Sequence, residues 1–413
     1  MNNSRVVKEC QICGSAQLES VLFLGFVPPV NAMPLIGELP AEGNVYPLEL
    51  LRCAHCTLVQ VGFEVDQQIL FPPSYPYRSG TTKILRENFA DLAAEATRQL
   101  GLTGSEFIVD IGSNDGTLLK NFRDAGHRVL GIEPSDAAVE AGLSGILTEQ
   151  RFFNSASAVE IRQCHGPAQL VTAANVFAHM PDVNDIVRAV LNLLGERGVF
   201  VSESHYLGGL LESLQHDTIY HEHLRYYSLK SLQWLFSAHG LEVFNVRRIP
   251  THGGSIRVYA ATAGVQPVSA AVHELLESED SSGLSDGSAL LTFRRRVTNS
   301  KVALYSLLEP LLRSGLAIYG VGAPSRATTL INYLGLNDGI LAGVFEVPNS
   351  KKVGRYIPGT RIPVISEDSL EGSRPDYLLL LSWHIADELV RNLRSKGYRG
   401  RFIVPLPEPR IID

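Results

Sequence analysis

The sequence predicts an α/β protein in which two doubly wound units follow a small cysteine-bearing domain. Two stretches indicate the doubly wound units, because each places a short apolar run before a glycine-bearing turn and a helix: "FIVDIGSNDGTLLKNF" from Phe107 and "GLAIYGVGAPSRATTL" from Gly315. Two Cys-x-x-Cys pairs near the N-terminus indicate the third domain. With 413 residues, 45% of them hydrophobic, the chain can form several cores. We expect the domains to span residues 1–68, 69–298 and 299–413.

Charge and hydropathy argue against several classes of function. The formal net charge is −7, which does not suit a surface that neutralises many phosphates, so we expect no nucleic acid partner. The first ten residues, "MNNSRVVKEC", lack the apolar segment of a signal peptide, and no run approaches the roughly 18 apolar residues of a membrane span. We therefore expect a cytoplasmic protein without a membrane partner. The sequence leaves the oligomeric state open.

The cysteines predict a metal site. In a reducing compartment, paired Cys-x-x-Cys units are more typical of metal binding than of disulfides, and four thiolates are a ligand set that a structural zinc ion prefers. The alternative is two unrelated redox or buried pairs. The segment between the pairs, which contains "FVPPVNAMP", is expected to be a loop or short hairpin. The predicted ligands are Cys10, Cys13, Cys53 and Cys56.

Two further residues bear on this prediction. His55 lies inside the second pair and is an alternative ligand, although four cysteines already complete the site. Cys164 has no partner in the sequence and is expected to be a buried thiol.

A strand, turn, helix, strand unit follows. Apolar residues recur at helical spacing over residues 82–100, and this pattern ends at Gly101, which predicts an amphipathic helix. Residues 107–111 predict a buried parallel strand, a helix follows from about Thr117, and a second strand, "VLGIE", ends at Glu133.

The turn "DIGSNDG" carries the chemistry of this unit. Gly112 and Gly116 let the backbone approach a ligand, Asp110 and Asp115 place carboxylates near it, and Glu133 can accept hydrogen bonds from both ribose hydroxyls. Acidic residues would repel the pyrophosphate of a dinucleotide but suit a ligand with an ammonium group, as S-adenosylmethionine has. The alternative is a purely structural turn. The region resembles the class I S-adenosylmethionine-dependent methyltransferases. Candidate cofactor-binding residues are Asp110, Gly112, Ser113, Asn114, Asp115, Gly116, Glu133 and Asn175.

A second stretch, "AQLVTAANVFAHMPDVNDIVRAVLNLLGERGVFVSES", predicts strand, loop, helix, turn and strand, with the turn at "LGERG". The loop after the first strand lies where open α/β sheets bind ligands, so Asn175 and His179 are candidates for the floor of an active site. A structural or solvated role is the alternative for such a histidine.

The segment "DTIYHEHLRYYSL", from Asp217, gathers phenols, imidazoles and a carboxylate. If it is extended, Tyr220 and Glu222 share one face while His221 and His223 share the other and can meet one ligand. The spacing lacks the i, i+4 histidine pair of a helical zinc protease site, which favours proton transfer over metal binding. The alternative is a satisfied buried polar network.

Together with "THGGSIRVY", the cysteine pairs and the cofactor turn, this segment resembles the bacterial sugar C-methyltransferases that act at C3 of thymidine-diphosphate-linked 4-keto-sugars. The resemblance covers nearly the whole chain and implies the order zinc-binding domain, cofactor domain and C-terminal Rossmann-like domain. It also implies that His223 is the base. The supporting groups that it implies are Tyr220, Glu222, His179 and a tyrosine of "SYPYRSG", either Tyr75 or Tyr77.

The implied chemistry starts at a C–H bond beside a ketone, which needs a positioned base and stabilisation of the enolate oxygen. His223 would take the proton, Tyr220 or His179 would donate to the enolate oxygen, and Glu222 would orient a neighbouring group. The carbon would then attack the sulfonium methyl group in line.

The C-terminal domain is expected to begin after a polar interval, "ESEDSSGLSDGS", that predicts a loop. The turn in "GVGAPSRATTL" opens a helix, so its amides and Arg326 can hold phosphate; lysine is common at this position in the related family. A nicotinamide site is the alternative, but Glu346 matches its acidic ribose ligand only loosely. We favour a cofactor-free domain that helps bind the nucleotide-sugar. The basic segment "PNSKKVGRYIPG" lies near the same sheet edge or forms a solvated loop.

The expected function is therefore an S-adenosylmethionine-dependent C-methyltransferase with a structural zinc ion, acting on a nucleotide-linked 4-keto-deoxysugar at C3. The alternatives are O-, N- or C-methylation of another small molecule, or a non-catalytic nucleotide-sugar-binding protein. Candidate substrate-binding residues are Tyr75, Tyr77, His221 and Arg326. The sequence does not fix the nucleotide base, the C2 substituent or the face that is methylated.

Overall fold

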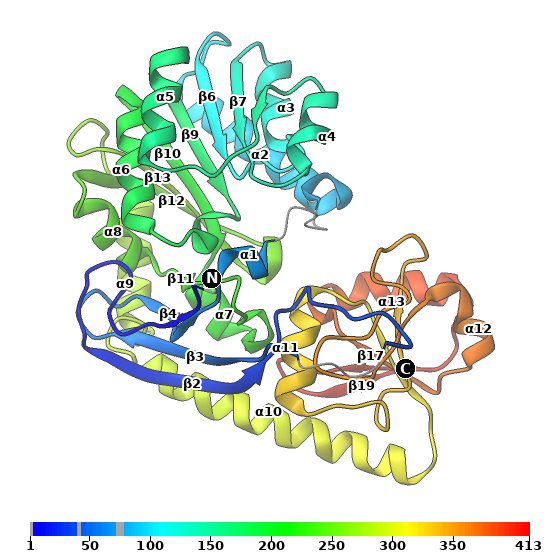
Figure 1. Ribbon diagram of the computed structural model, residues 1–413. Helices are drawn as coiled ribbons and strands as arrows, with labels where there is room; N and C mark the ends of the chain where they lie inside the picture. Colours follow the sequence, from blue (N-terminus) through cyan, green and yellow to red (C-terminus); the bar gives the residue numbers. More distant parts are fainter. Residues whose placement is uncertain (1–2, 39–42, 72–77) are drawn as a thin grey trace.

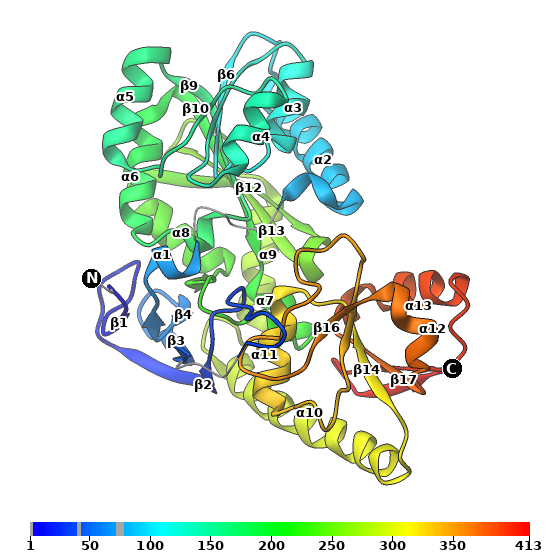
Figure 2. The same cartoon turned by 45° about the vertical axis from the view of Figure 1, so that its right-hand side comes forward.

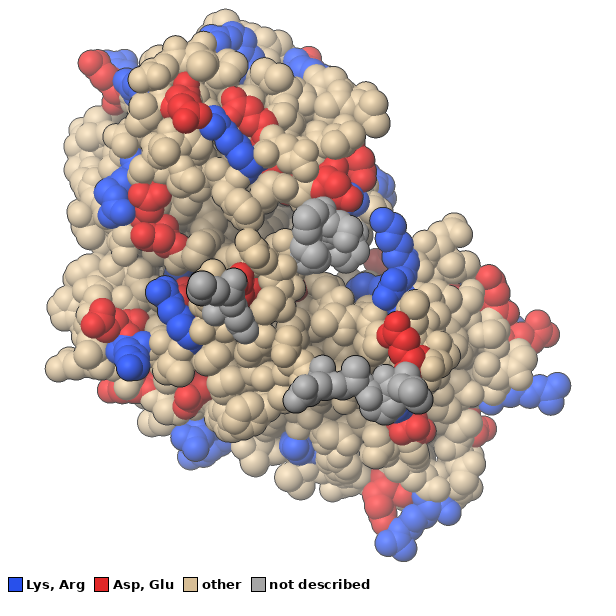
Figure 3. Space-filling view, in the orientation of Figure 1, with Lys and Arg blue, Asp and Glu red and all other residues tan. Residues whose placement is uncertain are grey.

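The computed structural model describes residues 3–38, 43–71 and 78–413. Figures 1 and 2 show an N-terminal sheet, a larger sheet-and-helix unit above it and a second α/β unit beside it. The long helix α10 (Ser288–Arg313) runs beneath the N-terminal sheet and on to the C-terminal unit (Figure 1), and the expected domain boundary at residue 298 falls within it. In the space-filling view the outline is notched between the upper and right-hand units, and charges of both signs are interspersed on this face (Figure 3).

The N-terminal unit is built on an antiparallel four-stranded sheet in the order β11-β4-β3-β2. β2 and β3 pair as a hairpin, and their length of ten and eight residues corrects the expectation of a loop or short hairpin. The edge strand β11 comes from far along the chain and joins the first unit to the second. The elements of this unit are β1 (Arg5–Val6), β2 (Leu18–Val27), β3 (Tyr46–Cys53), β4 (Val59–Val61), β5 (Phe63–Glu64), α1 (Gln67–Leu70) and β11 (Arg225–Tyr226).

The central unit has a seven-stranded sheet in the order β12-β13-β10-β9-β6-β7-β8. Its chain order reverses between β6 and β9, so ligands are expected at the carboxyl ends of these two strands. Apolar side chains alternate between the faces, one covered by α2 and α3 and the other by α5, α6 and α8. The strands are β6 (Phe107–Ile111), β7 (Arg128–Ile132), β8 (Thr148–Glu149), β9 (Ala168–Ala174), β10 (Leu194–His205), β12 (Leu241–Ile249) and β13 (Ser255–Thr262). The helices are α2 (Lys83–Leu100), α3 (Thr117–Asp124), α4 (Ala137–Leu143), α5 (Ser155–His165), α6 (Val183–Leu193), α7 (Leu207–Glu212), α8 (Leu229–Ser237) and α9 (Ala270–Ser281).

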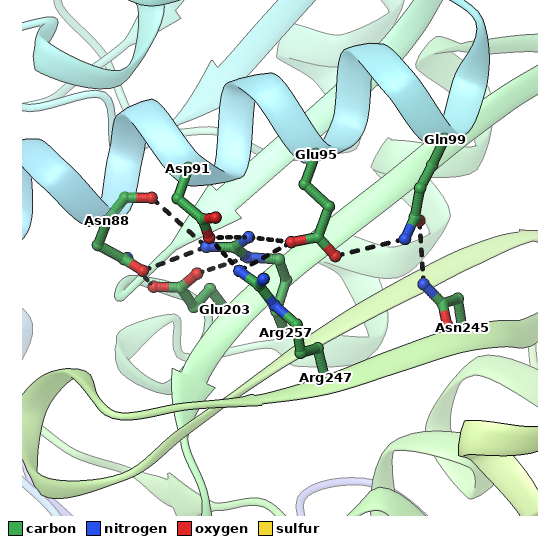
Figure 4. A network of polar contacts seen from close by, with 8 residues as sticks. All are labelled: Asn88, Asp91, Glu95, Gln99, Glu203, Asn245, Arg247 and Arg257. Carbon is green, nitrogen blue, oxygen red and sulfur yellow. Dashed lines mark hydrogen bonds and ion pairs between the residues drawn. The ribbon is translucent and has the colours of Figure 1, made fainter.

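A polar network with a buried centre joins α2 to the sheet (Figure 4). Arg257 of β13 is fully buried and its guanidinium lies 2.9 Å from a Glu203 oxygen and 2.5 Å from a Glu95 oxygen. The charge of this guanidinium compensates two carboxylates that are themselves almost completely buried, so α2 is fixed against β10 and β13. The network comprises Asn88, Asp91, Glu95, Gln99, Glu203, Asn245, Arg247 and Arg257.

Three local predictions in this unit are wrong. "LGERG" is not a turn but the irregular start of β10, with a register shift between Leu194 and Val199. Cys164 is exposed, because it lies on the outer side of α5. The polar interval is partly helical, and its Glu279 is buried where its carboxylate accepts hydrogen bonds from the first two amides of α8.

The C-terminal unit is a second doubly wound sheet in the order β16-β15-β14-β17-β18-β19, with only β19 antiparallel to its neighbour. Its elements are β14 (Ile318–Val321), α11 (Ser325–Leu334), β15 (Val344–Glu346), β16 (Val364–Ser366), α12 (Leu370–Ser373), β17 (Tyr377–Leu380), α13 (Ala386–Ser395), β18 (Arg401–Val404) and β19 (Arg410–Ile412). Within the described part of the chain, none of the helices combines the length and apolar character needed to cross a bilayer.

Candidate active site

The four paired cysteines meet at the base of the β2–β3 hairpin. Their sulfur atoms all lie within 4.8 Å of one another, with 3.3 Å between Cys10 and Cys56 and 3.6 Å between Cys13 and Cys53. Four sulfurs this close match the tetrahedral set around zinc, whose Zn–S bonds are about 2.3 Å. His55 lies outside the group, with its ring against Trp234 at 5.1 Å. The residues therefore fit a structural zinc ion.

The turn after β6 requires glycine at two positions. Gly112 and Gly116 have φ of +70° and +76°, and an added Cβ would lie 2.6 Å from Val176 and 2.9 Å from Ile146, respectively. Asn114 also has positive φ, at 50°. The two glycines therefore let the turn pack closely against Val176 and Ile146 at the point where the strand order reverses.

Glu133, at the end of β7, holds the turn in place. One carboxylate oxygen accepts the Asn114 amide at 3.0 Å and the other accepts the Ser135 amide at 2.9 Å. Each oxygen retains a further lone pair, so Glu133 can still accept a ribose hydroxyl. Ser113 lies buried within the same turn.

The two aspartates of the turn have different surroundings. Asp110 is buried and accepts the Thr172 hydroxyl at 2.6 Å, and burial raises the pKa of Asp110 to about 7. Its carboxylate therefore lies beneath the turn rather than open to a ligand. Asp115 accepts the Gly80 amide at 2.7 Å, and Asn114 accepts the Ser79 amide at 2.9 Å. The segment before α2 thus covers the turn, a contact that no local sequence signal indicated.

The loop after β9 contributes to the same edge of the sheet. The amide of Asn175, which has φ of 59°, donates to the Glu203 carbonyl at 2.7 Å. His179 follows in a short 3-10 helix (Phe177–His179) and its ring lies 4.9 Å from that of His223.

The segment from Asp217 to His223 is folded, not extended. It begins with a 3-10 helix (His216–Thr218) and turns so that the His223 amide donates to the Tyr220 carbonyl at 3.0 Å. The Tyr220 and His223 rings are 4.1 Å apart. The expectation that His221 shares a face with His223 is wrong, because the His221 ring contacts Tyr46 and Nε2 lies 3.3 Å from the Pro47 carbonyl. Burial lowers the pKa of His221 to about 4.

The hydrogen bond of His223 identifies its basic atom. Nδ1 lies 2.8 Å from the Thr218 carbonyl oxygen. A carbonyl can only accept, so Nδ1 carries the proton and Nε2 carries the lone pair. The imidazole is therefore held in the tautomer that a base needs at Nε2.

All three units meet at this turn. Asn31, from the N-terminal unit, donates to Glu222 at 2.8 Å and lies 3.5 Å from the hydroxyl of Ser325 at the start of α11. Lys352 donates to the Ala323 carbonyl at 2.6 Å, and burial lowers the pKa of Lys352, although the charges of Glu346 and Glu222 oppose this effect. The alternative of a solvated loop is thus excluded for Lys352. No local sequence pattern singled out Asn31.

Arg326 does not present a free edge to phosphate. Its guanidinium makes two 2.8 Å contacts with Asp217, contacts His384 and Gln215, and stacks on Trp383. Arg326 and Asp217 are both buried, so their ion pair fastens the C-terminal unit to the segment that leads to Glu222 and His223. The predicted phosphate contact of Arg326 is corrected accordingly.

Two predictions remain, namely the role of Glu346 in the C-terminal unit and the contact of Tyr75 or Tyr77 with the substrate. Glu346 accepts the Ala323 amide at 2.7 Å and so supports the glycine turn of its own unit. Tyr75 and Tyr77 lie outside the described residues.

A doubly wound sheet with an acidic glycine turn at its switch point, beside a histidine with a fixed tautomer, has the features of a class I methyltransferase. Family models match a zinc binding domain at residues 10–71, a methyltransferase domain at residues 83–246 and a C-methyltransferase C-terminal domain at residues 250–407. C-methyltransferase NovU of Streptomyces niveus is 35% identical to this chain over 414 residues, which cover 99% of the chain and 98% of NovU. The chain therefore belongs to the C-methyltransferase family, and it is an S-adenosylmethionine-dependent enzyme with a zinc-binding domain.

Two solved structures show more distant likeness. The magnesium protoporphyrin IX methyltransferase of Synechocystis PCC 6803 with bound SAM is 13% identical with a TM-score of 0.33, and the match covers 42% of this chain and 78% of that one. The CcbJ methyltransferase of Streptomyces caelestis is 14% identical with a TM-score of 0.34, and that match covers 43% and 90%, respectively.

Proposed function

We propose that the enzyme C-methylates a nucleotide-linked 4-keto-deoxysugar at C3, with His223 as the base. The observation that carries this proposal is the hydrogen bond from His223 Nδ1 to the Thr218 carbonyl, which leaves Nε2 as the basic atom. A C–H bond beside a carbonyl is acidic enough for an imidazole only when the developing enolate is also stabilised.

The neighbours of His223 supply that stabilisation in the proposed mechanism. The rings of Tyr220 and His179 lie 4.1 Å and 4.9 Å from that of His223, and these residues are the candidate donors to the enolate oxygen. Glu222 is held by Asn31 and orients this turn. Bound S-adenosylmethionine supplies the electrophilic methyl group, and the chain's part is to place the enolate carbon in line with it.

The third unit supports the choice of a nucleotide carrier. The N-terminus of α11 and the amino group of Lys352 both lie close to the turn that bears Glu222. A helix N-terminus and a lysine are the kind of groups that hold a diphosphate. We propose that residues 299–413 hold the nucleotide, residues 69–298 the cofactor and residues 1–68 the zinc ion.

The test is His223→Gln, assayed for α-hydrogen exchange and methyl transfer with thymidine-diphosphate-linked 4-keto-sugars and labelled cofactor. We expect turnover to fall by about 10²–10⁴-fold, because general base catalysis is lost, while cofactor affinity by calorimetry is unchanged. His273→Gln, at an exposed site on α9, is the matched control and should behave as wild type. Near-normal turnover of the His223 variant would exclude it as the base, and wild-type methylation only of substrates without a nucleotide would refute the substrate class.

A further inference from the structure

His205 is a second imidazole beside the proposed base that the sequence pattern did not single out. It is the last residue of β10, at the carboxyl end of a central strand of the sheet. Its ring lies 5.7 Å from that of His223 with a tilt of 45°, and the residue is half-buried. Rings at this centroid separation can exchange a proton through one bridging water molecule.

The surroundings of His223 limit how it can lose a proton. Its Nδ1–H is bound to the Thr218 carbonyl, so a proton taken from substrate resides on Nε2 and must leave from there. The nearby phenol of Tyr226 is a poor acceptor, because burial raises its pKa and keeps it neutral. The remaining described rings beside His223 are Tyr220, His179 and His205.

His205 is the best placed of these rings to pass the proton outward. Tyr220 is a phenol, which is neutral near pH 7 and has no proton vacancy. His179 is a proposed donor to the enolate oxygen, and its ring also contacts Phe71, with 5.8 Å between ring centroids. His205 is a half-buried imidazole at the carboxyl end of β10, and a neutral imidazole always has one unprotonated nitrogen.

We propose that His205 is the relay residue that returns His223 to its neutral form after each turnover. The inference rests on the proposed role of His223. The N–H bond at His223 Nε2 breaks, an N–H bond forms on the unprotonated nitrogen of His205, and His205 then releases its proton to water. No electrons are transferred, and the net products are the methylated ketone, the demethylated cofactor and one proton.

The test is His205→Ala in the full chain, assayed at fixed pH with increasing imidazole in the buffer. Loss of the relay should lower kcat by up to about 10²-fold, and imidazole should restore most of it in a saturable manner, because a small base can replace the missing side chain. Wild type and His273→Ala should show no such response. Cofactor affinity, measured by calorimetry, should be equal in all three proteins.

His205→Gln separates a relay from a structural role. Glutamine preserves hydrogen bonding but cannot accept a proton, so this variant should be as slow as the alanine variant and is expected to be rescued less well, since its side chain fills the space. A glutamine variant with wild-type kcat, or an alanine variant that is slow but insensitive to imidazole, would overturn the relay. Failure of the proposed function is distinguishable, since wild type itself would then show no α-hydrogen exchange and His223→Gln would retain its activity.

Discussion

Replacing Arg257 by methionine should strongly destabilise the central unit. The guanidinium is fully buried and is the charge that compensates Glu203, with Glu95 as its second partner (Figure 4). Arg257→Met leaves Glu203 buried without its cation, and breaking one side of such a pair costs about 3–5 kcal/mol. For a unit of this size, each kcal/mol lowers Tm by about 2–4 °C, so we expect a fall of about 6–20 °C.

The assay is urea and thermal unfolding followed by circular dichroism and by fluorescence. Arg247→Met is the matched control. Arg247 belongs to the same network, but its side chain is 42% exposed, its partner Asp91 is also exposed, and Glu95 keeps Arg257 as a partner when Arg247 is removed, so we expect a loss of about 1 kcal/mol or less. The double variant Arg257→Met, Glu203→Leu should recover much of the loss, since it removes the uncompensated charge. An Arg257→Met protein within about 1 kcal/mol of wild type would refute the reasoning.

Three further predictions follow from the same structure. Cys56→Ser should lower the bound zinc, by metal analysis of the purified chain, from about one ion to near none, and retention of a full equivalent would contradict the four-thiolate site. Asp110 has a folded pKa raised from 3.8 to about 7, so its burial costs stability increasingly as pH rises through this window, up to about 4 kcal/mol. The advantage in unfolding free energy of Asp110→Asn over wild type, from urea titrations, should therefore grow between about pH 4 and 7 and level off above, and a constant difference across this range would contradict this. Arg326→Ala should cost about 3–5 kcal/mol by leaving Asp217 unpaired, with faster proteolysis between the units, whereas wild-type resistance would exclude the fastening role.

The sequence predicted well those helices, strands and cysteine turns that depend mainly on residues close together in the chain. The strand Phe107–Ile111 was expected at the residues where it lies, and α2 begins within one residue of its expected start. Apolar runs and helical periodicity report burial directly, so they need no knowledge of distant residues. The four zinc ligands were likewise predicted, because each Cys-x-x-Cys pair forms its own turn.

Predictions failed where a residue's role depends on a distant partner. Arg326 was expected to hold phosphate, but Asp217, 109 positions earlier, takes its guanidinium. The segment that contains His221 is folded, and the His221 ring contacts the N-terminal unit. The alternation of side chains along a strand therefore predicted the wrong direction for this ring. No local motif singled out Asn31 or His205, and the basic segment that contains Lys352 left its placement open; only the assembled fold brings these residues to the turn of Glu222 and His223.

The turn that carries His223, the proposed base, is held by contacts from other parts of the chain. Asp217 is bound by Arg326 of the C-terminal unit, and Glu222 accepts a hydrogen bond from Asn31. The strand that follows the turn, β11, pairs with β4 of the N-terminal sheet. Recombination between relatives that exchanged one unit alone would therefore disturb the alignment of His223, even if each piece folded well. A change of substrate preference by laboratory evolution is best sought within the units, with these contacts between the units inherited together.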